Sequence, residues 1–217
     1  MKKVFILVIL LNCSELFCSD FSFSVRPFFS YNNDILTYSI YDGTKLNSRL
    51  DWKTPYLFKA GVNLSFMPGK WIIDISNAAA IPLQCGTMAD KDWYTENIQT
   101  NLSLHNLTPD FCYDLKIKLQ YQFNLKNDWT LLPGAAFYYS YSSLRGAGGK
   151  GWCGDSAHTG LFYDIPWNDE AAVQVQKFGI DLINRISTVL VGIGVRKNLD
   201  RWKLSSNLYV SPYIYIS

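Results

Sequence analysis

The sequence predicts an all-β protein, an antiparallel transmembrane β-barrel, from three observations. Apolar and polar residues alternate with a period of two in one segment after another, which indicates strands with one apolar and one polar face. The connections between these segments alternate between tight turns and long polar loops, as they do in outer-membrane barrels. Aromatic residues make up 16% of the chain and charged residues 18%, a balance that favours strands facing an apolar environment.

The first residues predict a secretory signal peptide over residues 1–19. Two lysines precede the apolar run 4–11, and a second short apolar patch ends at Cys18. A basic start followed by an apolar run of this length is typical of a segment that is removed after export. We therefore expect residues 20–217 to form one mature domain.

Seven strand segments lie between the breaks in the pattern. They cover residues 21–40, 47–67, 70–92, 104–125, 129–146, 171–197 and 202–217. A tilted strand needs only about 9 to 11 residues to cross a bilayer. The barrel is therefore expected to extend beyond the membrane on the side of its long loops.

The alternation of apolar and polar residues supports these segments one after another along the chain. It begins at residues 21–26, where large apolar residues alternate with two serines and Arg26, and it continues at 58–66. It is strictest at 113–124 and returns at 189–195. The stretch 168–186 has weak helical spacing, but its glycine and β-branched residues favour a loop that enters a strand.

The breaks are of two kinds. Tight turns are predicted at residues 68–69, 126–128 and 198–200, and long polar loops at 42–47, 92–110 and 146–170. Loops of one kind gather at each end of such a barrel. A secreted soluble β-sandwich would also alternate, so it stays open as an alternative fold.

Charge and cysteine content argue against a nucleic-acid partner and against a metal site. The net charge is only +2 and the basic residues are scattered, so no nucleic-acid partner is expected. Cys85, Cys112 and Cys153 remain in the mature chain; they are odd in number and lack metal-ligand spacing. The spacing therefore predicts no metal and no cofactor, and it leaves the role of the three thiols open.

Asp90 and Asp92 form the most distinctive polar feature of the chain. They lie two residues apart on an extended segment, so both side chains point to one face. Two crowded acids beside Trp93 and Tyr94 indicate a place for a proton, a metal or a cationic ligand. The structural alternative is a solvated strand end. In the predicted barrel both acids lie at the end of the third segment, at the mouth on the long-loop side.

At this stretch the sequence resembles the omptins, outer-membrane proteases of the Gram-negative envelope. Residues 88–93 match the family's Met-x-Asp-x-Asp-Trp run, and residues 50–53 and 61–63 match more of its second strand. Residues 101–105 resemble its Asp-x-Ser-x-His run, with Asn101 in place of the acid. The resemblance implies an omptin-type barrel of ten strands, of which this chain would carry about seven.

The resemblance also implies an activity. Omptins cleave peptides next to basic residues with water held between an aspartate pair and an Asp-His pair. By position, Asp90 and Asp92 correspond to the catalytic aspartate pair, and Met88, Ser103 and His105 correspond to cleft residues. The site would face the outside of the cell.

The Asp-His half of the site is where this chain departs from the family. In omptins that pair follows the seventh strand, and this sequence stops at Ser217. The resemblance therefore predicts a C-terminally truncated relative, with little or no cleavage by this chain alone. His105 and His158 are the two histidines, and His158, in the loop after the fifth strand, is interpreted as a solvated residue rather than a substitute base.

The resemblance to omptins also implies partners. The expected partners are peptide or protein substrates with basic residues, and outer-membrane lipid. A second chain is a further expected partner, because an open sheet in hydrocarbon exposes unpaired edges. Besides the endopeptidase, a non-catalytic outer-membrane barrel or adhesin stays open as an alternative function.

Overall fold

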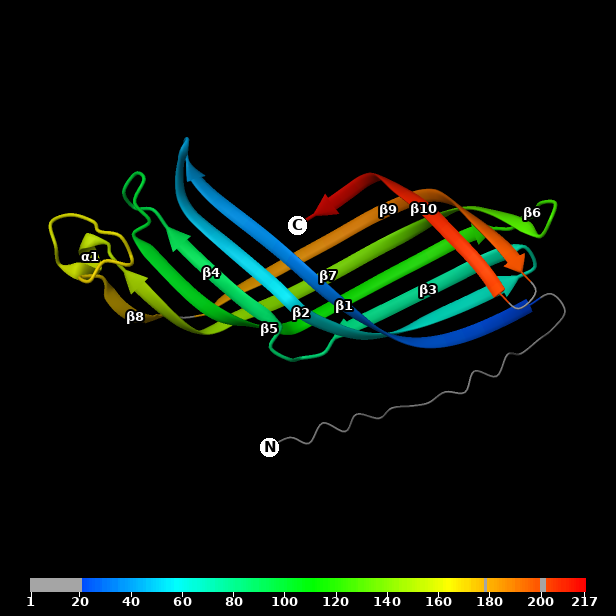
Figure 1. The fold of residues 1–217 in the computed structure, drawn as a ribbon, viewed down its shortest axis with the longest axis horizontal. Helices are drawn as coiled ribbons and strands as arrows, with labels where there is room; N and C mark the ends of the chain where they lie inside the picture. The colour runs from blue at the N-terminus through cyan, green and yellow to red at the C-terminus, as the bar shows by residue number, and fades with distance from the viewer. Residues whose placement is uncertain (1–20, 178, 200–201) are drawn as a thin grey trace, which may run out of the picture.

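The computed structural model describes residues 21–177, 179–199 and 202–217, and nearly all of this backbone is antiparallel β-sheet (Figure 1). The predicted signal peptide lies outside the described residues. No helix in the described part of the chain is long and apolar enough to cross a membrane.

One large sheet contains all the strands. They are β1 (Phe21–Asp42), β2 (Lys45–Pro68), β3 (Trp71–Ala80), β4 (Gly86–Asp92), β5 (Asn101–Tyr121), β6 (Phe123–Asn124), β7 (Trp129–Cys153), β8 (Val173–Lys177), β9 (Ile180–Leu199) and β10 (Trp202–Ile216), with one helix, α1 (Ser156–Thr159). The strand order is β1-β2-β3-β5-β7-β9-β10, with β4 beside β2 and β5, and with β6 and β8 beside β7. The predicted all-β antiparallel fold is confirmed, and each of the seven segments is one strand or one interrupted strand.

The ends of the strands differ from the prediction on the long-loop side. β5 begins at Asn101 and β7 continues to Cys153, so two of the predicted long loops are shorter. The first predicted loop is a tight turn at Gly43, whose φ is 60°. At the end of β7 the alternating pattern is lost because residues 146–151 are mostly glycine, which has no side chain to alternate, although the backbone ladder between β5 and β7 continues. The helix α1 was not predicted.

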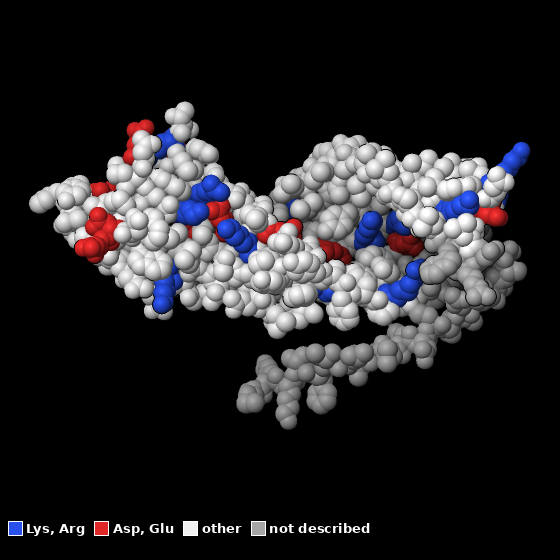
Figure 2. All heavy atoms as spheres, viewed as in Figure 1, with Lys and Arg blue, Asp and Glu red and all other residues white. Residues whose placement is uncertain are grey.

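The sheet is apolar outside and polar inside. Val189, Val191, Ile193 and Val195 on β9 are 40 to 47% exposed. On β5, Ile117 and Leu119 are exposed as well, whereas alternate residues line a cavity. A soluble sandwich would bury its apolar face, so this arrangement favours the membrane barrel. Figure 2 shows charged side chains in the hollow of the sheet, while much of the surrounding surface is uncharged.

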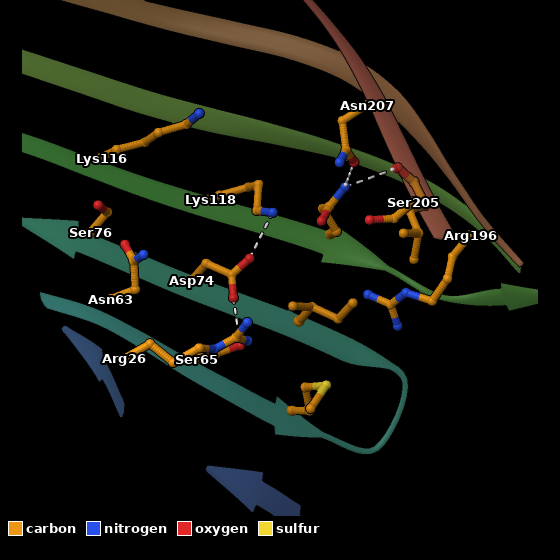
Figure 3. A pocket seen from close by; sticks show the side chains of 14 residues that line it. Arg26, Asn63, Ser65, Asp74, Ser76, Lys116, Lys118, Arg196, Ser205 and Asn207 are labelled. Carbon is orange, nitrogen blue, oxygen red and sulfur yellow. Dashed lines mark hydrogen bonds and ion pairs between the residues drawn. The ribbon is translucent and has the colours of Figure 1, made fainter. Parts of the chain in front are cut away.

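The inner face carries a polar cavity of about 590 Å³ near the tight-turn end (Figure 3). Asp74 is its acidic centre: it lies 2.7 Å from Lys118 Nζ and accepts a hydrogen bond from Ser65 Oγ at 2.5 Å. Gln120 Nε2 donates to Asn207 Oδ1 at 3.0 Å and thereby links β5 to β10. These contacts satisfy polar groups that face inward.

Toward the other end, an apolar cluster lies beside the acid pair. It comprises Trp52, Leu57, Cys85, Met88, Leu107, Cys112 and Leu144. Trp52 and Met88 are directly opposed in the ladder between β2 and β4. Met88 is two residues before Asp90, so this cluster supports the strand that carries the acids.

Candidate functional site

Asp90 and Asp92 lie on β4 with their side chains on one face. In the ladder between β4 and β5, Asp90 is opposite Ser103 and Asp92 is opposite Asn101. Directly opposed residues of an antiparallel pair point to the same side, and Ser103 and Asn101 are both buried. Ser48 Oγ donates to Asp90 at 3.4 Å. The two half-buried carboxylates therefore face inward at the end of the sheet that carries β4 and α1 (Figure 1).

Lys91 separates the acids in sequence but points away from them. Its Nζ lies 2.6 Å from Asp51 Oδ2, and the other oxygen of Asp51 accepts from Arg49 Nε at 2.9 Å. Because side chains alternate along a strand, this cluster lies on the outer face. The lysine between the two acids therefore points to the opposite face of β4 from their side chains.

His105 and Ser103 form a buried pair beside the acids. Ser103 Oγ and His105 Nε2 are 3.1 Å apart, and His105 is 2% exposed and directly opposite Met88. A Cβ at Gly149 would lie 2.1 Å from His105 Nδ1, so the ring is pressed against the backbone of β7. The five site residues predicted from the sequence thus lie on one face of β4 and β5.

A second group of polar residues lies next to the acid pair and forms a row across neighbouring strands. Asn101 is opposite Asp92 on one side and opposite Cys153 on the other, so one line of side chains crosses β4, β5 and β7. Just beyond Cys153, Asp155 caps the N-terminus of α1 and accepts from the backbone N–H of His158 at 3.1 Å. The row therefore ends in a carboxylate and an imidazole.

Asp155 and His158 are hydrogen-bonded through their side chains. His158 Nδ1 is 2.8 Å from each oxygen of Asp155, and the histidine side chain is 44% exposed. The prediction of a merely solvated His158 missed this pairing. The Asp-Ser-Ala-His order could have indicated it, because an N-cap aspartate and a residue three positions later lie close together.

The neighbours of these acids determine which groups are charged. Burial raises the pKa of Asp155, but hydrogen bonds from His158 and Asn101 outweigh it, so the pKa lies below its ordinary value. Burial together with the charges of Asp92, Asp155 and Cys153 raises the pKa of Tyr94. Near neutral pH the mouth therefore combines the ionised carboxylate of Asp155 with the neutral phenol of Tyr94.

Comparison with known proteins identifies the fold. The structure is similar to the crystal structure of the outer membrane protease OmpT from Escherichia coli, with a TM-score of 0.70 and 13% identity over 89% of this chain. The matched part covers 66% of the OmpT chain, slightly less than two thirds of its length. No protein family and no curated protein matches the sequence. The expected omptin-type architecture is confirmed: this chain has an omptin-like fold.

Proposed function

We propose that this protein is an outer-membrane, omptin-like endopeptidase whose mouth binds peptides carrying basic residues, with Asp90 and Asp92 as the acids of the site. The observation that carries the proposal is the inward-facing acid pair at one end of an omptin-like sheet. Lys91, the cation nearest in sequence, is bound to Asp51 on the outer face. The pair faces the mouth, where a cationic ligand would meet both carboxylates.

The spacing of the acids suits a cationic side chain and a water molecule. Residues two apart on a strand are separated by about 6.6 Å along it, which leaves room for a guanidinium or ammonium group between the carboxylates. Charge-assisted hydrogen bonds to arginine are among the stronger polar contacts. Tyr94, exposed at the same end, adds an aromatic face that attracts cations.

Hydrolysis requires a base to activate the water. In the omptin scheme that base is the histidine of an Asp-His pair on the facing wall, while the aspartate pair positions the water. Asp90 and Asp92 supply the second of these functions. Binding of basic peptides is the part of the proposal that the described residues support most directly, and an adhesin-like role without cleavage is the second candidate.

A peptide assay tests both parts. The full chain, refolded in detergent, is mixed with a fluorogenic peptide containing an Arg-Arg pair and with a matched peptide in which citrulline replaces both arginines. We expect the arginine peptide to bind at least about tenfold more tightly, a difference of about 1.4 kcal/mol. Asp90→Asn and Asp92→Asn should each reduce that preference, whereas Asp128→Asn, in a turn at the opposite end, should not.

The outcomes are distinct. Equal binding of both peptides, or an unchanged preference in both acid variants, would overturn the proposed site. Selective binding with fluorescence release supports the endopeptidase. Selective binding without release favours the adhesin-like role.

Orientation and further partners belong to the same proposal. The acid pair would face the cell exterior, and the exposed apolar residues of the outer surface would contact outer-membrane lipid. β1 and β10 end the strand order, so a second chain is proposed to pair with these edges. Crosslinking between cysteines introduced on the two edge strands of separately tagged copies would detect such a chain.

A further inference from the structure

Three metal-binding side chains converge at the end of the row that begins with Asp92. Cys153, Asp155 and His158 each offer one ligand atom, and these atoms all lie within 4.8 Å of one another. Two of the residues are buried and His158 is exposed. We propose that Cys153, Asp155 and His158 bind a Zn²⁺ ion at the mouth, an inference that goes beyond peptide binding by the acid pair.

The donor set selects zinc by its chemistry. Thiolate, imidazole and carboxylate are the three kinds of protein ligand that Zn²⁺ takes, and three protein ligands leave one tetrahedral position for water. Magnesium and calcium prefer sites made of oxygen alone, which a thiolate does not provide. Sequence spacing predicts no metal site here, because the proximity depends on how residues 153–158 fold.

The backbone holds the three ligands in place before any ion arrives. Gly154 N donates to Thr100 O at 2.8 Å, and Ile165 N donates to Gly154 O at 2.8 Å. A Cβ at Gly154 would lie 2.2 Å from Ile165 O, so only glycine fits this close approach. The cap of α1 then fixes Asp155 relative to His158. A site that is already formed loses little conformational entropy on binding.

Asn101 provides an independent indication of a missing ligand. It is 3% exposed and directly opposite Cys153, and its side chain hydrogen-bonds to Asp155. Within the described residues its Oδ1 accepts no hydrogen bond. A buried carbonyl oxygen without a donor costs about 1 to 3 kcal/mol. Water in the fourth position of the zinc ion would supply that donor.

Zinc binding releases one proton from the site. The Cys153 thiol loses its proton to solvent and the resulting thiolate forms the sulfur–zinc bond. Asp155 contributes a carboxylate oxygen and His158 a ring nitrogen as the other two ligands, close to the positions that the cap of α1 already gives them. The ion thereby joins the end of β7 to α1, next to Asp92 and Asn101.

Cobalt substitution tests the site on the full chain refolded in detergent with a non-thiol reductant. Co²⁺ bound to a thiolate gives a sulfur-to-metal charge-transfer band, and a tetrahedral site gives strong d–d bands. We expect one equivalent of Co²⁺ to produce both and Zn²⁺ to abolish them. Cys153→Ser should lose the charge-transfer band, and His158→Ala should weaken binding about tenfold or more.

A variant of another buried cysteine controls for general effects of removing a thiol. Cys112→Ser changes a buried thiol of the apolar cluster and should leave both bands intact. Heat-modifiable gel migration establishes that each variant is folded. The proposal is overturned if the folded wild type shows no charge-transfer band with stoichiometric Co²⁺, or if folded Cys153→Ser retains it. Neither result depends on whether Arg-Arg peptides bind, so this test and that of the acid pair fail separately.

Discussion

Lys91 Nζ lies 2.6 Å from Asp51 Oδ2, and this contact ties the lysine between the two mouth acids to the outer face of the sheet. Asp51 is buried and accepts further hydrogen bonds from Arg49 and Thr37. One outward-facing carboxylate thus organises three donors on β1, β2 and β4. It also keeps Lys91 away from Asp90 and Asp92.

Asp51→Asn should destabilise the protein by about 1 to 3 kcal/mol, because removing the charge weakens several hydrogen bonds of a buried acceptor. Urea unfolding followed by tryptophan fluorescence measures the change. Asp110→Asn is the matched control: its partner Arg145 is 54% exposed, so the loss should stay below about 1 kcal/mol. Equal losses in the two variants would contradict the central position of Asp51.

Lys59 and Asp114 form an inward-facing ion pair whose coupling can be measured. Lys59 is 2% exposed, its Nζ lies 2.6 Å from Asp114 Oδ2, and Ser140 Oγ donates to the other oxygen at 2.7 Å. Lys59→Met leaves the largely buried carboxylate of Asp114 without its cation. The free energy of unfolding should fall by about 3 to 5 kcal/mol. Adding Asp114→Asn should restore part of that loss. A double-mutant cycle in urea that gives additive losses would show that the two groups are not coupled.

The strands were predictable from the sequence because their two faces contrast strictly in polarity. Lys116 and Lys118 alternate with Ile117 and Leu119, and the structure turns the lysines to a cavity and the apolar pair outward. The shared face of the acid pair followed from the same periodicity. These features depend on local order along one strand.

The mouth was less predictable because its features depend on contacts between distant segments. Residues 146–170 were predicted as a long polar loop, yet β7 continues to Cys153, and Gly149 lets the buried ring of His105 lie against the strand. Cys153 and Asp155 meet His158 only because a cap and a glycine contact fold the chain back at that point. Spacing alone does not encode such proximity.

Asp155 predicts a specific dependence of stability on pH in metal-free protein. Its pKa in the folded chain lies below the ordinary 3.8, so ionised Asp155 stabilises the fold above about pH 4, and this contribution is lost as pH falls toward the folded-state pKa. Asp155→Asn keeps a capping side chain but removes the charge. The free energy of unfolding should therefore differ between wild type and variant at pH 6, and the difference should shrink as the pH falls below 3.8.

Urea titrations at several pH values in the presence of a chelator measure this difference. Glu96→Gln, on the exposed loop before β5, serves as the control and should not reproduce the pattern. A difference between wild type and Asp155→Asn that stays constant from pH 6 to pH 3 would contradict the assignment.

The direction in which the mouth faces can be tested on whole cells, because the three described cysteines are buried and form no disulfide. A membrane-impermeant maleimide should therefore react little with the unmodified protein. Glu96→Cys places a thiol on the exposed loop beside the acid pair, and Lys126→Cys places one in the exposed tight turn at the other end. If the mouth faces the exterior, Glu96→Cys should be labelled on intact cells, and Lys126→Cys only after the outer membrane is opened. The reverse pattern would turn the acid pair toward the periplasm, away from the peptides that it is proposed to bind.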